Sequence, residues 1–224
     1  MEKIAVYTGT RNIYSDMIMS ARSLIENSDV DRVVFLTEDD VIPDLPQKCE
    51  VRNVRFQRYF GNDGPNRKTK FTYMAMMRAA LALEFPENDI VLSLDSDLVV
   101  VKPIGSYLWD LPLEDKYYFA AAREPHRCKD GKIYCNIGVC VQNLALMRRK
   151  NKPWQYIDAL NTRFYPYVDQ DVMNYMSGNM IYELSGDYNA CDWTVRSDDP
   201  KIIHFAGIKR ENWIHDPVVE KWRK

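Results

Sequence analysis

The sequence predicts a single α/β domain built on a mostly parallel sheet, and three observations support this prediction. A strand, a helix and a second strand follow one another within the first forty or so residues, an order typical of a parallel α/β unit. A later strand is hydrophobic at almost every position, as expected for a central strand covered on both faces. The chain has 224 residues, of which 46% are hydrophobic, enough for one domain with a full core. We therefore expect one Rossmann-like domain with a mixed, mostly parallel sheet and flanking helices.

The first hundred residues are predicted to supply the parallel strands. Short hydrophobic runs at residues 4–8 and 32–37 indicate buried strands, and residues 14–25 between them carry apolar side chains at helical spacing. A third strand is predicted over residues 51–56, and the Gly- and Asn-rich residues 61–66 indicate a loop. A helix is then predicted over residues 68–85, ended by Pro86. The hydrophobic strand at residues 89–94 delivers Asp95 at its carboxyl end, where ligands bind in open parallel sheets.

Beyond Pro103 the periodicity is weaker. Strands are predicted over residues 117–122 and 137–141, and helices over residues 144–149 and 154–164. Shorter elements are expected over residues 169–176, 180–184 and 201–205. No repeat and no shift in composition marks a domain boundary.

Composition excludes some classes of function. The formal net charge of -2 gives no basic field to hold a nucleic acid, so we expect none as a partner. No window approaches the roughly 18 continuous apolar residues of a membrane-spanning helix, so no membrane span is expected. The five cysteines include no C-x-x-C pair, which favours reduced thiols and a cytoplasmic protein.

Three D-x-D pairs occur in the sequence, and their contexts separate them. Asp29/Asp31 lies in a polar turn where surface aspartates are ordinary, whereas Asp95/Asp97 flanks a serine directly after a hydrophobic strand. Two carboxylates this close repel each other unless a cation or a proton intervenes. Divalent ions take such oxygen ligands together with phosphate oxygens, so the pair predicts a metal at a nucleotide diphosphate. The third pair is Asp169/Asp171.

The strand, the Asp95-Ser96-Asp97 pair and the apolar run that follows, from Leu92 to Val100, closely resemble a motif of glycosyltransferase family 8. This retaining group contains glycogenin and bacterial lipopolysaccharide galactosyl- and glucosyltransferases. The resemblance covers most of the chain and implies a GT-A type fold and sugar transfer from a nucleotide sugar. It further implies that Asp95 and Ser96 contact the donor and that Asp95 and Asp97 hold the metal.

Two earlier segments resemble the donor-binding parts of the family. Thr8 and Tyr14 are similar to the end of the first strand and the uracil-binding residues. Arg78, seventeen positions before Asp95, is similar to a basic helix residue that reaches the donor sugar or diphosphate. The resemblance implies substrate-binding roles for all three. It also implies a nucleotide-binding half over residues 1–100 and a sugar and acceptor half over residues 101–224.

Two later segments resemble the part of the family that holds the sugar. The strand around Asn136 and Gly138 is similar to an Asn-small-Gly-Val strand whose Asn contacts the sugar, with Ile137 in place of the usual Ser or Ala. Asp169-Gln170 opens a D-Q-D segment that lines the reacting face of the donor sugar, although from the residues alone an N-cap aspartate would be favoured. The resemblance implies that Asn136, Asp169 and Gln170 are catalytic and that Gly138 binds substrate.

The segment from Ile202 to Trp213 resembles the His-aromatic-x-Gly motif of the family. The resemblance implies that His204 is the third metal ligand, that Gly207 contacts substrate and that a lysine contacts the diphosphate. The usual Pro is missing here and Trp213 follows His204 by nine positions instead of eight. Lys209 and Arg210 therefore both remain candidates for the diphosphate.

The expected reaction is the transfer of glucose or galactose from a UDP-sugar, with retention, to a glycan, a lipid-linked sugar or a protein. A nitrogen ligand beside two carboxylates favours Mn²⁺ as the cofactor, with Mg²⁺ as the alternative. No dedicated nucleophile is evident, which favours front-face attack by the acceptor.

Three other functions are compatible with parts of the sequence. A phosphatase or phosphotransferase with a nucleophilic aspartate also places D-x-D after a hydrophobic strand, with Asp198-Asp199 as its later acidic pair, but there the motif normally follows the first strand. A sugar-nucleotide pyrophosphorylase would need more glycines than Gly9 to cradle a triphosphate. A non-catalytic sugar-nucleotide-binding module would keep the same ligands without turnover.

Overall fold

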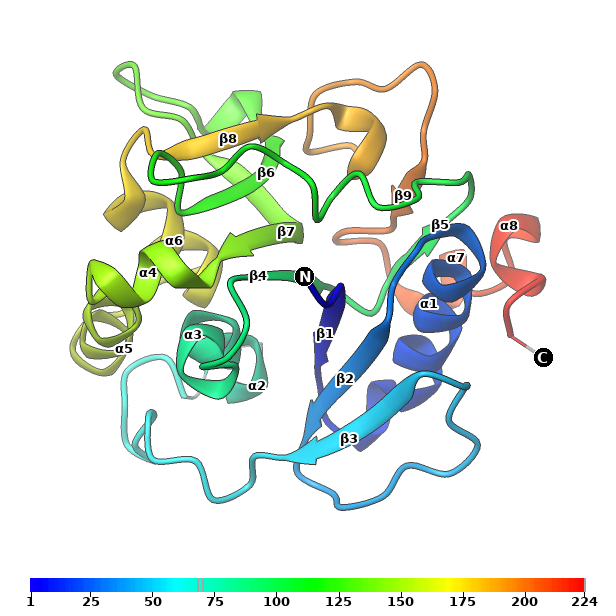
Figure 1. Ribbon diagram of the computed structural model, residues 1–224, viewed down its shortest axis with the longest axis horizontal. Helices are drawn as coiled ribbons and strands as arrows, with labels where there is room; N and C mark the ends of the chain where they lie inside the picture. Colours follow the sequence, from blue (N-terminus) through cyan, green and yellow to red (C-terminus); the bar gives the residue numbers. More distant parts are fainter. Residues whose placement is uncertain (68, 70, 224) are drawn as a thin grey trace.

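A seven-stranded mixed sheet runs through the computed structural model, which describes residues 1–67, 69 and 71–223 (Figure 1). The strand order across the sheet is β3-β2-β1-β4-β7-β6-β8. The strands are β1 (Ile4–Thr8), β2 (Arg32–Thr37), β3 (Cys49–Asn53), β4 (Ile90–Leu94), β6 (Phe119–Arg123), β7 (Cys135–Asn143) and β8 (Ile181–Leu184).

The first four strands of this sheet are parallel to one another. β1 pairs with β2 and with β4, and β2 pairs with β3. β7 then inserts antiparallel between β4 and β6, and β8 lies parallel to β6. The expected mixed, mostly parallel sheet is therefore confirmed.

A second, two-stranded sheet brings distant parts of the chain together. β5 (Leu98–Val100) pairs antiparallel with β9 (Ile202–His204), so that Leu98 faces His204. Because β5 follows the Asp95-Ser96-Asp97 segment directly, this pairing fixes where that segment lies relative to His204.

Helices cover both faces of the large sheet. Successive strand residues point to opposite faces, and apolar side chains on each face pack against helices. Ile4 and Val6 pack into the core beneath α2 to α6, whereas Ala5 and Tyr7 pack into the core beneath α1. Figure 1 shows α4 to α6 at one end of the molecule and α1, α7 and α8 at the other. The helices are α1 (Tyr14–Asn27), α2 (Tyr73–Met76), α3 (Leu81–Glu84), α4 (Leu144–Arg149), α5 (Lys152–Thr162), α6 (Val168–Ser177), α7 (Arg210–Trp213) and α8 (Pro217–Glu220).

Two predicted elements differ from those observed. The helix predicted over residues 68–85 begins at Tyr73, since Thr69 Oγ1 bonds the backbone of Phe71 and competes with helical hydrogen bonds; Lys68 and Lys70 lie outside the described residues. A 3₁₀ turn over Met77–Ala80 divides the rest of it. The third strand ends at Asn53 because the side chain of Asn53 accepts from the backbone N–H of Arg55 and turns the chain.

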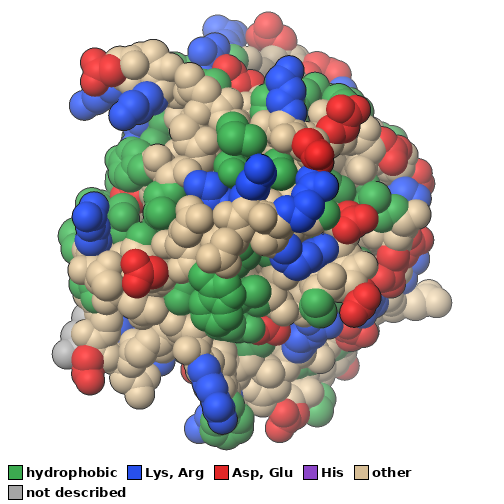
Figure 2. Space-filling model, turned by 60° about the vertical axis from the view of Figure 1, so that its left-hand side comes forward, with side chains coloured by type: hydrophobic (Ala, Val, Ile, Leu, Met, Phe, Trp, Pro, Cys, Tyr) green, Lys and Arg blue, Asp and Glu red, His purple; other side chains and the backbone are tan. Residues whose placement is uncertain are grey.

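None of the helices in the described part of the chain is long and apolar enough to cross a bilayer. Figure 2 shows hydrophobic side chains exposed among Lys and Arg across the middle of one face, and Phe56, Trp154 and Phe164 are among the exposed large hydrophobic residues of the chain.

Candidate active site

A cleft of about 560 Å³ opens beyond the carboxyl ends of β1 and β4. Thr8 lines it from the end of β1, and Asp95, Ser96 and Asp97 line it from the segment after β4. Residues from α2, α6 and α7 complete its walls. The cleft lies where a ligand is expected in an open parallel sheet, because the strand ends there present polar groups at one edge.

Asp95 and Asp97, which line this cleft, meet the buried side chain of His204, which is not among the lining residues. His204 Nε2 lies 3.3 Å from Asp97 Oδ1 and 3.5 Å from Asp95 Oδ2. The β5–β9 pairing and a hydrogen bond from the Phe205 N–H to the carbonyl of Asp97 (2.8 Å) hold the two segments together. Ligand atoms about 2.1 Å from a cation and at right angles to each other would be about 3 Å apart, so the three groups fit one divalent ion.

The electrostatics of the cluster match such an ion. Burial alone would lower the pKa of His204, but Asp97 and Asp95 outweigh it and raise the pKa to about 10. Burial opposes ionisation of Asp95, yet Arg78 and His204 hold the pKa of this carboxyl below its usual value. Positive charge is therefore favoured between the carboxylates, and in the metal-free protein the imidazolium supplies it.

Gly138 on β7 makes room for His204. A Cβ atom at this position would lie 2.1 Å from His204 Cε1 and 2.6 Å from His204 Nδ1. The carbonyl of Gly138 also accepts from the N–H of Asp95 at 2.8 Å. The geometry therefore shows that this glycine leaves space for the ring of His204 beside the strand.

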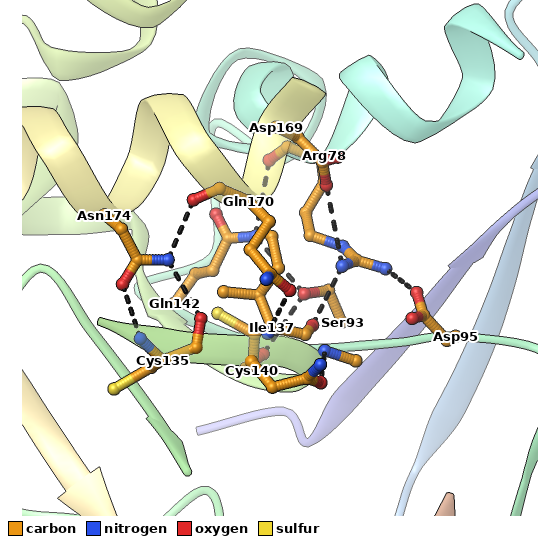
Figure 3. A network of polar contacts seen from close by, with 12 residues as sticks. Arg78, Ser93, Asp95, Cys135, Ile137, Cys140, Gln142, Asp169, Gln170 and Asn174 are labelled. Atoms are coloured by element: carbon orange, nitrogen blue, oxygen red, sulfur yellow. Dashed lines mark hydrogen bonds and ion pairs between the residues drawn. The ribbon is translucent and has the colours of Figure 1, made fainter. Parts of the chain in front are cut away.

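Arg78 joins Asp95 to Asp169 of α6 through a buried guanidinium. It donates to Asp95 Oδ1 and to the carbonyl of Ile137 (2.8 Å), and its Nη1 lies 3.5 Å from Asp169 Oδ2 (Figure 3). Burial raises the pKa of Asp169 to about 7, although Arg78 opposes that shift. Arg78 thus lines the cleft, and its charge is paired with two carboxylates of the site.

Two side chains of α6 fasten this helix to β7 (Figure 3). Gln170 Oε1 accepts from the N–H of Ile137 at 3.2 Å. Asn174 bonds both the N–H and the carbonyl of Cys135, at 2.7 and 2.9 Å. These contacts set the position of Asp169 at the start of the helix.

Asn136 and Gln170 converge on one buried carboxylate. Glu124 Oε1 accepts from Asn136 Nδ2 at 2.9 Å and from Gln170 Nε2 at 3.2 Å. Asn136 itself does not line the cleft, whereas Gln170 does. One network therefore holds both amides that were expected to be catalytic, with Gln170 lining the cleft and Asn136 away from its surface.

The structure separates the two cations at the start of α7. Arg210 lines the cleft and pairs with the buried Asp16 of α1 at 2.7 Å. Lys209 has a largely exposed side chain that lies 3.9 Å from Glu211, and it is not among the lining residues. Gly207 adopts a φ of 75°, which favours glycine, in the turn that leads to both residues.

Tyr14 lies outside the main cleft. Its hydroxyl donates to Asp39 Oδ2 at 3.0 Å, and Arg11 pairs with the same carboxylate at 2.9 Å. All three line a neighbouring hollow. Thr8 and Tyr14, which the sequence groups together, thus face different recesses.

Sequence reasoning missed Glu124 and Asn189. Both are buried, and Asn189 Oδ1 lies 2.8 Å from His204 Nδ1. Neither belongs to a motif, and a lone Glu or Asn in a weakly periodic stretch carries no signal of its own. Only the pairing of strands and loops brings them to the site.

Solved structures of three glycosyltransferases are among those that share the GT-A type α/β fold of this chain. The galactosyltransferase LgtC, solved with donor and acceptor sugar analogs, gives a TM-score of 0.68 at 18% identity, covering 92% of this chain and 87% of that chain. GlyE from Streptococcus pneumoniae TIGR4 gives 0.70 at 20% identity, covering 99% and 59%. The bifunctional glycosyltransferase WbbM gives 0.69 at 17% identity, covering 92% of this chain and 46% of WbbM, so this chain spans about half its length.

The family model for glycosyl transferase family 8 matches residues 6–210, and the chain belongs to this family. It is therefore a glycosyltransferase, and this membership sets aside the phosphatase and the pyrophosphorylase. A search of curated protein sequences found no match.

Proposed function

We propose that this glycosyltransferase transfers glucose or galactose from a UDP-sugar to an acceptor, with retention of anomeric configuration and with the help of a divalent metal. The observation that carries the proposal is the cluster of Asp95, Asp97 and His204, whose two carboxylates line the main cleft. Two carboxylates and an imidazole suit a cation that also binds a diphosphate. The solved LgtC, a galactosyltransferase, supports the choice of reaction.

The ion that best fits this donor set is Mn²⁺, with Mg²⁺ as the alternative, because one of the three ligands is nitrogen. When bound, the ion would stabilise the negative charge that develops on the diphosphate as the anomeric bond breaks. Asp95, Asp97 and His204 would hold it.

The other side chains of the cleft would bind and orient the substrates. Arg210 is the better candidate for the diphosphate because it lines the cleft, whereas Lys209 does not. Ser96 and Thr8 would contact the donor, and Asp169 with Gln170 would face the donor sugar. Neither side chain is suited to act as a nucleophile, because Asp169 is paired with Arg78 and Gln170 is neutral. This supports front-face attack by the acceptor.

The acceptor would be a glycan, a lipid-linked sugar or a protein. Residues 1–100 would form the nucleotide half of the domain, and residues 101–224 the sugar and acceptor half. All five cysteines are free, which supports a reaction in the reducing cytoplasm.

The test is a panel of UDP-sugars with Mn²⁺, in which the release of UDP without an acceptor is measured for the wild type and for Asp97→Asn. Asp97 is chosen over Asp95 because removal of Asp95 would also leave the buried Arg78 short of a partner. The variant should lose at least about tenfold of the metal-dependent release.

Asp31→Asn is the matched control, since Asp31 belongs to another D-x-D pair and lies exposed outside the cleft. Full activity of Asp97→Asn would contradict the proposed site. Tight binding of UDP and Mn²⁺ without any turnover would instead favour a binding module.

A further inference from the structure

We infer that Asn189 is a positioning residue that keeps a proton on Nδ1 of His204 and thereby directs Nε2 of the same ring to the metal. The inference rests on the proposed metal-dependent transfer. It concerns a residue that belongs to none of the motifs described above and lies outside the cleft lining.

Asn189 is fully buried and held from several sides. Its backbone N–H donates to the carbonyl of Gly186 at 3.1 Å, and its backbone carbonyl accepts from Thr194 Oγ1 at 2.6 Å. The next residue, Ala190, bonds β9 through the carbonyl of Ile202 and the N–H of His204, at 2.9 and 3.0 Å. The segment therefore presents the Asn189 side chain to the histidine ring in a fixed position.

Two neighbouring groups set the orientation of the Asn136 side-chain amide, because one can only accept a hydrogen bond and the other can only donate one. A carboxylate, Glu124, accepts from its Nδ2 at 2.9 Å, and a backbone N–H, that of Gly138, donates to its Oδ1 at 2.9 Å. An ionised carboxylate can only accept and a backbone N–H can only donate. The Oδ1 of Asn136 must therefore face Gly138 and, beside it, Asn189.

This orientation determines that of Asn189 in turn. Asn189 Nδ2 faces two acceptors, Asn136 Oδ1 at 2.9 Å and the Asn136 carbonyl at 3.3 Å. A flipped amide would oppose oxygen to oxygen at both contacts. Asn189 Oδ1 is therefore the atom that lies 2.8 Å from His204 Nδ1, and since it can only accept, Nδ1 must carry the proton.

A proton on Nδ1 leaves Nε2 as the nitrogen whose lone pair can reach a cation. Nε2 is also the atom that faces Asp95 and Asp97, at 3.5 and 3.3 Å. Histidine ligands in metal sites generally donate their second N–H to an outer partner, which fixes the ring and the tautomer. Here the amide oxygen of Asn189 serves as that partner. Asn136 links Asn189 to the buried carboxylate of Glu124, which also accepts from Gln170.

The first experiment is made on metal-free protein and again with Mg²⁺, a diamagnetic ion. Both are needed because without a metal the raised pKa of His204 keeps protons on both ring nitrogens and only the neutral ring reports the tautomer. In protein with ¹⁵N-labelled histidine, His204 should show a slowly exchanging Nδ1–H, because both partners of this bond are buried. The chain has only three histidines, and His126 and His215 are exposed, so their ring protons should exchange quickly. Asn189→Leu should abolish the slow signal. A wild-type His204 without a proton on Nδ1, or an unchanged signal in the variant, would overturn the inference.

The second experiment measures Mn²⁺ binding by titration calorimetry. Asn189→Leu should weaken binding by about 10- to 100-fold, as is typical when the outer partner of a metal ligand is removed. Asn189→Asp keeps an acceptor for Nδ1–H, although its second oxygen would oppose two oxygens of Asn136, so it should retain the slow signal and lose less Mn²⁺ affinity than Asn189→Leu. Equal losses in the two variants would contradict the role of the acceptor.

Asn179→Leu is the control for the same replacement at an exposed site, since Asn179 bonds Gly131 and Ile133 and not the ring. It should leave the Mn²⁺ affinity unchanged. Absence of Mn²⁺ binding to the wild type would refute the proposed metal site, whereas the Nδ1–H signal separately decides the role of Asn189.

Discussion

At the scale of single residues, Gly138 and Asp169 show how tightly the site is built. Gly138 is a glycine because the His204 ring occupies the space of its missing side chain. Asp169 is a carboxylate kept from water, and this burial raises its proton affinity although the buried guanidinium of Arg78 opposes the shift. Both residues were singled out from their motifs, but these physical roles depend on neighbours far away in the sequence.

Gly138→Ala should displace His204, because the new Cβ would lie 2.1 Å from its ring. We expect at least about tenfold weaker Mn²⁺ binding and a loss of about 1–3 kcal/mol in the free energy of unfolding. Calorimetric titration and chemical denaturation measure the two effects. Gly61→Ala is the control, since a Cβ at Gly61 would meet no atom within 4 Å. Normal metal binding by Gly138→Ala would show that the ring can move aside without harm.

Asp169 should make stability depend on pH in the metal-free protein. Its pKa is raised from 3.8 to about 7 in the fold. The folded state therefore binds the proton more tightly, and the stability gained at low pH is lost as the pH rises through 7. Between pH 5 and pH 7 this group should lower the free energy of unfolding by about 2 kcal/mol. Asp169→Asn removes this contribution.

Denaturation of both proteins in chelator at several pH values tests the effect. The difference in the free energy of unfolding between wild type and Asp169→Asn should change by about 2 kcal/mol between pH 5 and pH 7. The loss of the ion pair with Arg78 adds a constant cost that does not affect this change. Parallel pH profiles would mean that the carboxyl ionises normally in the fold.

At the scale of elements, the junction between α6 and β7 determines where Asp169 and Gln170 lie in the cleft. The helix has only ten residues, and its placement on the strand relies on the polar contacts of Gln170 and Asn174 as well as on apolar packing. The bent course of α2 and α3 serves the same junction, because the 3₁₀ turn between them carries Arg78 toward Asp169.

Asn174→Ala should loosen α6. It would leave the buried N–H and carbonyl of Cys135 without their side-chain partner, at about 1–3 kcal/mol for each unsatisfied group. We expect a lower melting temperature and a fall in kcat that exceeds any change in Mn²⁺ affinity, because Asp169 moves while the metal ligands stay. Asn179→Ala, near the exposed end of α6, should change stability by no more than about 0.5 kcal/mol. Equal stability of the two variants would show that packing alone seats the helix.

At the scale of the whole molecule, two sheets and the cores around them bring residues from all parts of the chain to one cleft. The large sheet aligns the ends of β1 and β4, and the small β5–β9 sheet closes the site from the far end of the chain. The C-terminal helices pack Trp213, Val219 and Trp222 against α1 and the small sheet. This packing anchors α7 and with it Arg210 at the edge of the cleft.

The sequence by itself determined the fold class, the strands β1 and β2 to the residue, and the family. Hydrophobic runs and helical spacing are local, and the Asp95-Ser96-Asp97 motif lies directly at a strand end, so both can be recognised from neighbours in the chain. Local hydrogen bonds moved the start of the helix to Tyr73 and the end of the third strand to Asn53.

Only the tertiary structure showed that Arg210 lines the cleft and Lys209 does not. It also paired Arg78 with two carboxylates and placed Asn189 against His204. These outcomes depend on contacts between segments distant in sequence, in which a buried donor must meet an acceptor. Satisfying buried polar groups is a property of the packed fold as a whole, and no local pattern encodes which partner each group will find.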